Sequence, residues 1–564
     1  MIRNIFRILK QLKMKMIKKD HLKKHLLIIL TFPFLIILGL FIHKDYGISI
    51  DEESTRMHGL VSLNYISNLF FPDTLFDFQL INNIPDFYNY PYKEYGVFFE
   101  IFLITIVEVF IGEKEFSKIF YLRHLITNLL FLSSLICFYL ISLEIFKNKY
   151  YSYLSVIILY SSPRIFADSF YNDKDLVFLS FIIFSILFII KFMKRTSYMN
   201  AVSLAFVLSL TINIRVIGIY LMLLVILFIL IKILMENRFL IKKFSSLILF
   251  MISSVVFLYI FWPFLWESPL DNLVYALKSF SKYGWGLNVF YLGDFYQDKH
   301  LPWHYPYVYF FATTSIFLSI ITFFGMIIII LRFVKRLLKI DDTKSNNDIW
   351  KSDKERNLLL IFSSAVVPLF LIYLFNSIIY NGWRHLYFIF PSLVILGIYF
   401  VEFFTLQYKK SNVGKLIPAL LILIVINNMF NLVKLHPHQY VYFNKIYENK
   451  ANDLFEIDYW GVANKQALEE IIERNPNKGS IVIGVASFAN LNLSKKMLSK
   501  ELKNKIIISG QEFDDADFIF NNNYSDVNTL IDDKYSIPKN FKKYSSLKKG
   551  NIIIYEFYKK NDKF

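Results

Sequence analysis

The sequence predicts an α-helical polytopic membrane protein, with about eleven transmembrane helices and a small α/β domain at the C-terminal end. Of its 564 residues, 55% are hydrophobic and 18% are aromatic, and the mean hydropathy is +0.43. Apolar runs of about 20 residues, the length that a helix needs to cross a bilayer, recur along most of the chain. Strand-like runs follow from about residue 435. These two patterns define a membrane part and a terminal domain.

The N-terminal segment predicts a cytoplasmic start. Residues 1–24 carry nine Lys or Arg and one Asp, and such a positive excess favours the cytoplasmic side. The following run, "HLLIILTFPFLIILGLFIH", is longer than a typical signal-peptide core and lacks a small-residue cleavage site, so we expect a retained helix. Residues 44–118 then hold twelve Asp or Glu against five Lys or Arg. This acidic stretch is expected to be an extracytoplasmic loop.

The remaining crossings are predicted within residues 25–434, by apolar runs that begin near residues 119, 150, 176, 199, 216, 244, 307, 357, 385 and 416. One crossing for each run places the basic connecting segments on the cytoplasmic side. This holds only if "VFFEIFLITIVEVFIG", residues 97–112, does not cross. As a helix it spans about 24 Å, less than the ~30 Å hydrocarbon core, so we expect it to lie at the outer surface. A true crossing there would invert every later loop.

The last segment, residues 435–564, has the pattern of a small extracytoplasmic α/β domain. The runs "GSIVIGVASF", "KIIISG", "ADFIFNN" and "NIIIYEFYKK" predict strands, and "NKQALEEIIER" and "NLSKKMLSKELK" predict helices.

Charge and cysteine content exclude two other classes. The net charge of +17 resides in short basic clusters between apolar runs, which is typical of cytoplasmic loops and not of a nucleic-acid-binding surface. Cys137 is the one cysteine and lies within an apolar run, so an intrachain disulfide, a CxxC metal site and a redox pair are all excluded.

Ionisable residues converge on the predicted outer face from several segments. They are Asp51 and Glu52 after the first helix, Asp168, Lys174 and Asp175 in the loop of residues 162–178, and Arg123, Arg384 and His385 at the starts of two crossings. An ionisable group at the edge of the hydrocarbon costs a few kcal/mol unless it has a partner. Their convergence predicts a site. Simple solvation of the acidic pair and snorkelling of the arginines are the plain alternatives. Glu53, His58, Asp173, His436 and His438 are expected to be surface residues.

The order of these features resembles the GT-C superfamily of membrane glycosyltransferases. The closest resemblance is to the protein O-mannosyltransferase and lipid A aminoarabinose-transferase branch, which is glycosyltransferase family 39-like, over roughly residues 25 to 435. The Asp-Glu of the first outer loop in that branch is matched by Asp51 and Glu52. An "HPP-x-GK"-like segment is only loosely matched by "YPYKEYG", which lacks the histidine.

Three further motifs support the resemblance. A "Y-x-x-R" crossing is matched by Tyr121 and Arg123, with the spacing shifted by one. An "RY-x-x-P-x-x-P" entrance is matched by Arg384, His385 and Pro391. An "SR…LD" loop is matched by "SPRIFADSFYNDKD", whose extra residues leave open whether Asp168 or Asp175 is the equivalent aspartate.

The resemblance implies transfer of a sugar from a polyprenyl-phosphate donor to an acceptor hydroxyl of a protein, lipid or glycan, on the extracytoplasmic face of the cell membrane. Asp51 is then the expected base, and Glu52 would orient the acceptor. The expected phosphate ligands are Arg384, Arg215, Lys174 and Arg123, and the expected acceptor- or metal-orienting residues are Asp168, Asp175 and His385. The carboxylates could hold Mg²⁺ or Mn²⁺, although three carboxylates distant in sequence do not define a metal site.

Two other classes of function remain open from the sequence. A polytopic transporter is one alternative, although the 18 Gly in 564 residues are few for such proteins, whose helices are commonly broken by Gly or Pro, and no matching halves are seen. A non-catalytic assembly factor of the cell envelope, with the terminal domain as a binding module, is the other.

Overall fold

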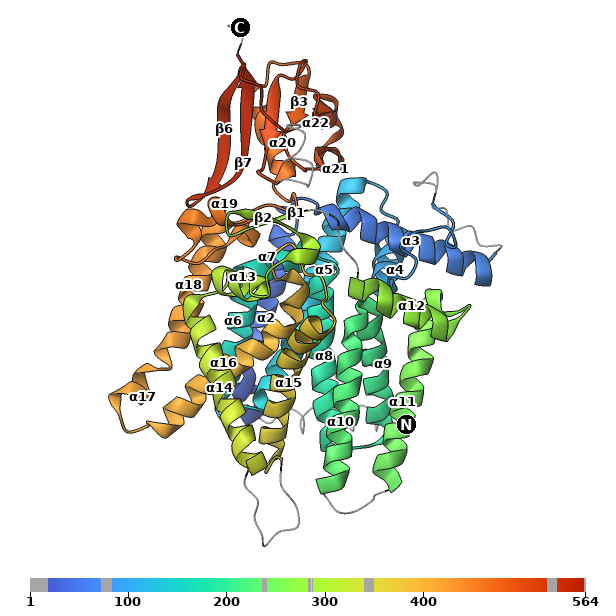
Figure 1. Ribbon diagram of the computed structural model, residues 1–564, viewed down its shortest axis with the longest axis vertical. Helices are drawn as coiled ribbons and strands as arrows, with labels where there is room; N and C mark the ends of the chain where they lie inside the picture. The colour runs from blue at the N-terminus through green and yellow to red at the C-terminus, as the bar shows by residue number, and fades with distance from the viewer. Residues whose placement is uncertain are drawn as a thin grey trace, which may run out of the picture.

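The computed structural model describes residues 19–72, 84–235, 241–282, 286, 288–338, 349–524 and 535–561. These residues form a bundle of long helices with a β-sheet region at one end (Figure 1). Most of the predicted cytoplasmic segment 1–24 lies outside the described residues.

Nine helices in the described part of the chain are long and apolar enough to cross a membrane. They are α2 (Lys19–Ile42), α5 (Phe116–Leu143), α8 (Asp175–Lys194), α10 (Ile219–Met235) with the preceding 3₁₀ turn η2 (Val216–Gly218), α11 (Ile241–Phe261), α14 (Ile316–Leu338), α15 (Asp353–Leu374), α16 (Phe390–Gln407) with the preceding 3₁₀ segment η5 (Arg384–Ile389), and α18 (Ala419–Leu435) with the end of α17 (Asn412–Leu416). The polytopic helical class that the sequence predicts is therefore confirmed.

Two of the predicted crossings fall on shorter helices. These are α9 (Tyr198–Ile214), with 17 residues, and α6 (Lys149–Ser161), with 13 residues. α6 stops because Pro163, which lacks an N–H, begins a separate helix, α7 (Pro163–Tyr171). The run near residue 307 is also divided, into α13 (Tyr305–Thr313) and α14. Membrane crossing by α6 and α9 stays a prediction.

The segment of residues 97–112 forms α4 (Phe98–Ile104) and one π-helical stretch, η1 (Thr105–Phe110). It is not among the nine long helices. It is packed under α3 (Ile50–Phe70): a Cβ atom on Gly59 of α3 would lie 2.7 Å from the Cβ of Glu100. The segment is thus partly buried beneath α3 instead of lying uncovered at the surface.

The C-terminal part contains a five-stranded mixed sheet of strand order β4-β3-β5-β7-β6. Its strands are β3 (Ile481–Val485), β4 (Ile506–Gly510), β5 (Phe518–Asn521), β6 (Phe541–Lys549) and β7 (Ile552–Lys560). β3 is parallel to β4 and β5, and β7 is antiparallel to β5 and β6. The helices α20 (Asn464–Glu473), α21 (Leu491–Lys495) and α22 (Lys500–Asn504) complete it. Four strands were predicted, whereas the lysine-rich edge strand β6 was missed.

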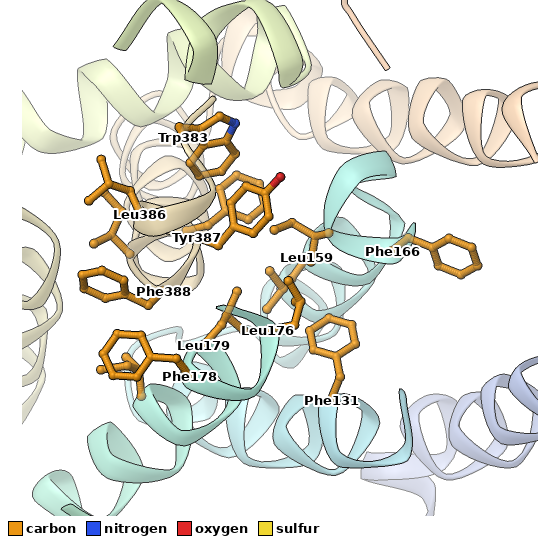
Figure 2. Close-up of a cluster of buried hydrophobic side chains, with 14 of the residues drawn as sticks. Phe131, Leu159, Phe166, Leu176, Phe178, Leu179, Trp383, Leu386, Tyr387 and Phe388 are labelled. Carbon is orange, nitrogen blue, oxygen red and sulfur yellow. The ribbon is translucent and has the colours of Figure 1, made fainter. Parts of the chain in front are cut away.

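Aromatic and aliphatic side chains fix the 3₁₀ segment η5 (Arg384–Ile389) against the bundle. Phe388 of η5 packs edge-on against Phe178 of α8, with ring centroids 4.9 Å apart. Figure 2 shows these rings together with Trp383, Leu386 and Tyr387, beside side chains of α5, α6 and α8. The residues at the start of η5 are therefore held by a packed core.

The C-terminal ends of α10 and α14 lie at the end of the bundle opposite the sheet (Figure 1), and their last turns carry Lys232, Lys335 and Arg336. Lys194 at the end of α8 pairs with Glu144, and Lys354 of α15 pairs with Glu402. Because positive connections favour the cytoplasmic side, the end that carries α3 and the sheet is expected to be extracytoplasmic.

Cysteine labelling tests this orientation. In a Cys137→Ala background, we expect Ser54→Cys of α3 to react with a membrane-impermeant maleimide in intact cells, since Ser54 is exposed at the sheet end. Lys410→Cys, exposed at the opposite end, should react only after permeabilisation. The reverse pattern would place α3 in the cytoplasm.

Candidate functional site

A cavity of 680 Å³ lies at the sheet end of the bundle, a volume within the range of small-molecule sites, which is about 300–1,000 Å³. One wall is polar and carries Asp51, Lys174, Arg215, Arg384 and His385. The other walls are mainly apolar, with side chains from η2 (Val216–Gly218), α12 (Pro269–Lys282) and α15, such as Ile217, Leu277 and Leu371. The cavity therefore suits a ligand that has a charged head and an apolar body.

Four charged side chains on the polar wall form an alternating chain. Arg384 Nη1 donates to Asp51 Oδ2 at 3.0 Å and lies 3.4 Å from Asp175 Oδ2. The other oxygen of Asp175 pairs with Arg215 Nη2. Asp175 is almost fully buried, whereas the side chain of Asp51 is 39% exposed. Asp51 is thus the carboxylate that a ligand in the cavity can reach.

Lys174 adds a cation that no carboxylate of the described residues pairs with at ion-pair distance. Its Nζ lies 3.7 Å from the centre of the Tyr95 ring. Burial, together with the nearby charge of Arg215, lowers the pKa of Lys174 to about 7. With Lys174 protonated, three cations face two carboxylates on this wall, which leaves one positive charge and favours an anionic ligand.

Glu52 does not line the cavity. Its Oε2 accepts a hydrogen bond from the N–H of Ser49 at 2.7 Å, as in the returning half of a capping box at the start of α3. Its Oε1 lies 2.9 Å from His124 Nε2. With only 1% of the residue exposed, Glu52 acts on the start of α3 and does not face a ligand, contrary to the role expected from the sequence.

Arg123 is also absent from the cavity wall. It lies in a buried cluster where it contacts Glu100 of α4 and, at 2.8 Å, Asp173. Thr55 of α3 donates to the same Asp173 carboxylate at 3.0 Å. Burial, followed by the charge of Glu100, raises the pKa of Asp173 well above its usual value. The cluster joins α3, α4 and α5 beneath the cavity.

Three residues expected at the surface are buried. Asp173 is 5% exposed, His58 9% and His438 1%. His58 Nδ1 lies 2.5 Å from the Tyr90 hydroxyl, and burial lowers the pKa of His58 to about 3. The surface interpretation was wrong for these residues because sequence separation hides their partners. Glu100 was missed as well, although a carboxylate inside the apolar run of residues 97–112 is itself a signal of a buried partner.

The structure distinguishes between Asp168 and Asp175, the two candidates for the site aspartate in the loop of residues 162–178. Asp168 is buried away from the cavity and accepts a 2.6 Å hydrogen bond from the Tyr171 hydroxyl. Burial raises its pKa to about 6. Asp175, in contrast, contacts both Arg215 and Arg384. Asp175 is therefore the loop aspartate that belongs to the site.

The carboxylates do not assemble into a metal centre. Within the described ranges, no group of three His, Cys, Asp or Glu side chains is placed to hold an ion. Glu52 is taken up by Ser49 and His124, and Asp175 by two arginines. The donor set for Mg²⁺ or Mn²⁺ that the sequence suggested does not come together.

Comparison with known proteins finds similar structures. No protein-family model and no curated protein matches the chain. The similar solved structures include ArnT from Cupriavidus metallidurans bound to undecaprenyl phosphate and the same protein in the apo state. Each alignment covers 94% of this chain and 97% of the ArnT chain, with a TM-score of 0.44 and 10% identity. Such a distant likeness concerns the course of the chain and carries no information on substrate.

Substitution of the two loop aspartates should separate their roles. Asp175→Asn leaves Arg215 and Arg384 without their shared carboxylate, and we expect the free energy of unfolding to fall by about 3 kcal/mol. Asp168→Asn keeps its neutral hydrogen-bond partners and should cost about 1 kcal/mol. Denaturant unfolding in detergent measures both, and equal losses would contradict the assignment of Asp175.

Proposed function

We propose that the protein is a membrane glycosyltransferase, which transfers a sugar from a polyprenyl-phosphate donor to an acceptor hydroxyl on the extracytoplasmic face. The observation that carries the proposal is the cavity, in which a reachable carboxylate and three cations occupy one wall and mainly apolar side chains, with Lys278 among them, occupy the others. A polyprenyl-phosphate sugar has the matching parts: an anionic phosphate and a long hydrocarbon chain.

Asp51 is the proposed general base. The acceptor hydroxyl oxygen attacks the anomeric carbon, the bond from that carbon to the phosphate oxygen breaks, and the proton of the hydroxyl passes to the Asp51 carboxylate. Polyprenyl phosphate leaves with the electron pair. Exposure of Asp51 toward the cavity supports this role, because a base must reach the proton that it removes.

Arg384, Arg215 and Lys174 are the proposed partners of the phosphate. All three line the cavity on the same wall, and cations placed where charge develops on a leaving group stabilise the transition state. The planar guanidinium of Arg384 can donate two parallel hydrogen bonds to a phosphate, which a lysine ammonium cannot. His385 lines the same wall and is proposed to orient the acceptor.

Sugar transfer by membranes tests the proposal directly. Membranes that contain the protein, supplied with a radiolabelled polyprenyl-phosphate sugar, should transfer the label to an endogenous acceptor. Movement of label across the membrane without transfer would indicate a transporter. The absence of both transfer and movement would indicate an assembly factor.

Asp51→Asn keeps the shape of the side chain and removes the proton acceptor, so we expect transfer to fall by on the order of 10²-fold or more at unchanged expression. The matched control is Glu53→Gln. Glu53 pairs with Lys496 and does not line the cavity, so its loss should leave transfer within about twofold. Near-normal transfer by the Asp51 variant would reject the base assignment.

The low pKa of Lys174 predicts a pH dependence. The ammonium is charged below about pH 7 and is lost above it, so kcat/KM for the singly charged phosphodiester donor should fall as pH rises from 6 to 8. Since kcat/KM reports groups of the free enzyme, Lys174→Arg, which stays charged throughout, should abolish this fall. A fall that persists in the arginine variant would assign it to another group.

A further inference from the structure

We infer that Trp460 is a positioning residue of the site, which holds Arg384 and Asp51 in place from the C-terminal part of the chain. The inference deepens the proposed glycosyl transfer and rests on it. Trp460 lies 76 residues beyond Arg384 in the sequence, where no site residue was expected.

The indole ring of Trp460 covers the Arg384 guanidinium. The Cζ atom of Arg384 lies 4.6 Å from the centre of the Trp460 ring and 5.4 Å from that of Tyr380. Trp460 is 2% exposed and Arg384 is 6% exposed. A cation over an aromatic face is held more strongly when both are shielded from water, and Trp is the best such partner.

The hydrogen bonds of Arg384 leave this orientation incompletely fixed. Its Nη1 contacts Asp51 and Asp175, but its Nε is buried and has no hydrogen-bond partner among the described residues. A guanidinium that is bonded through Nη1 can still turn about that contact. Contact with the indole ring restricts the plane, and the plane decides whether the fork of N–H groups can face a phosphate.

The backbone of Trp460 acts on the helix start that carries Asp51, the carboxylate that pairs with Arg384. Its carbonyl oxygen accepts a hydrogen bond from the N–H of Ile50 at 3.0 Å. Ile50 is the first residue of α3 and precedes Asp51. The first N–H groups of a helix lack partners within the helix, so this bond fixes the point at which α3 begins. The approach is close: a Cβ atom on Gly47 would lie 2.4 Å from the carbonyl oxygen of Val462.

The turn that carries Trp460 is also anchored to the C-terminal sheet. The carboxylate of Asp458 accepts hydrogen bonds from the N–H groups of Val462 and Ala463, both at 3.2 Å. Asn522, which directly follows β5, donates to the carbonyl oxygen of Asp458 at 3.2 Å. Gly461 has a φ of +68°, which favours glycine, and lets the chain reverse into α20. The sheet thereby sets where the indole ring lies.

Purified full-length variants test the inference through two readouts, sugar transfer and binding of polyprenyl phosphate. Trp460→Leu removes the ring, and we expect the affinity for polyprenyl phosphate and kcat/KM each to fall about tenfold or more. Trp460→Phe keeps a weaker ring and should lose only about two- to threefold. Trp303→Leu is the matched control, because Trp303 lies 71% exposed outside the cavity wall, and it should behave as wild type.

A double-mutant cycle separates positioning from general stability. If Trp460 acts through the charge of Arg384, the loss caused by Trp460→Phe or Trp460→Leu should vanish in an Arg384→Gln background. Additive losses would overturn the inference, as would equal phosphate affinity of wild type and Trp460→Phe. If Trp460→Leu does not fold, the same measurements on Trp460→Phe test the inference.

The two proposals fail in different ways. A wild-type protein that binds polyprenyl phosphate in a Trp460-dependent manner but transfers no sugar would reject the proposed reaction and keep the positioning of Arg384. A wild-type protein that transfers sugar, with Trp460→Leu equally active, would reject the positioning role alone.

Discussion

The pairing of Asp175 with two arginines is the interaction on which the polar wall depends. Arg215 lies between α9 and η2, Asp175 begins α8, and Arg384 begins η5, so one buried carboxylate joins three separate parts of the bundle. Removal of charged groups from water costs several kcal/mol for each ion, and it is tolerated only where partners are in place. Because Asp175 pairs with both arginines, the other carboxylate of the wall, Asp51, can stay at the cavity and remain accessible. The core in Figure 2 supports this arrangement by fixing α8 against η5.

A second group of buried ion pairs attaches the segment between α2 and α5 to the neighbouring helices. Glu100 of α4 contacts Arg123 of α5, and Glu108 of η1 pairs with Arg56 of α3. Each carboxylate thus has a cation on a neighbouring helix, which allows α4 and η1 to be partly buried. The same contacts place α3 over the cavity, with its first turn directed at Arg384.

The sequence predicted much of the fold and about half of the site, for identifiable reasons. The length of an apolar run predicts a membrane helix because the thickness of the bilayer sets that length. The edge strand β6 was not predicted because its lysines interrupt the apolar alternation. Ionisable residues at helix ends identified the right end of the bundle, and Asp51, Lys174, Arg215, Arg384 and His385 do line one cavity. Glu52, Arg123 and Asp168 do not, because a sequence does not show which neighbour a residue faces. The consecutive residues 173–175 illustrate this: Asp173 points to Arg123, Lys174 to the cavity and Asp175 to the arginines. Trp460 was beyond such reasoning, since its contact depends on how the terminal sheet docks.

The contact between Arg384 and Asp51 also links donor binding to the proposed base. Arg384 Nη1 donates to Asp51, and a donor phosphate would compete for the same guanidinium. Arrival of the phosphate would therefore leave the Asp51 carboxylate free to accept a hydrogen bond from an acceptor hydroxyl. Because Trp460 restricts the guanidinium plane, the terminal sheet contributes to this exchange although it supplies no group to the reaction itself.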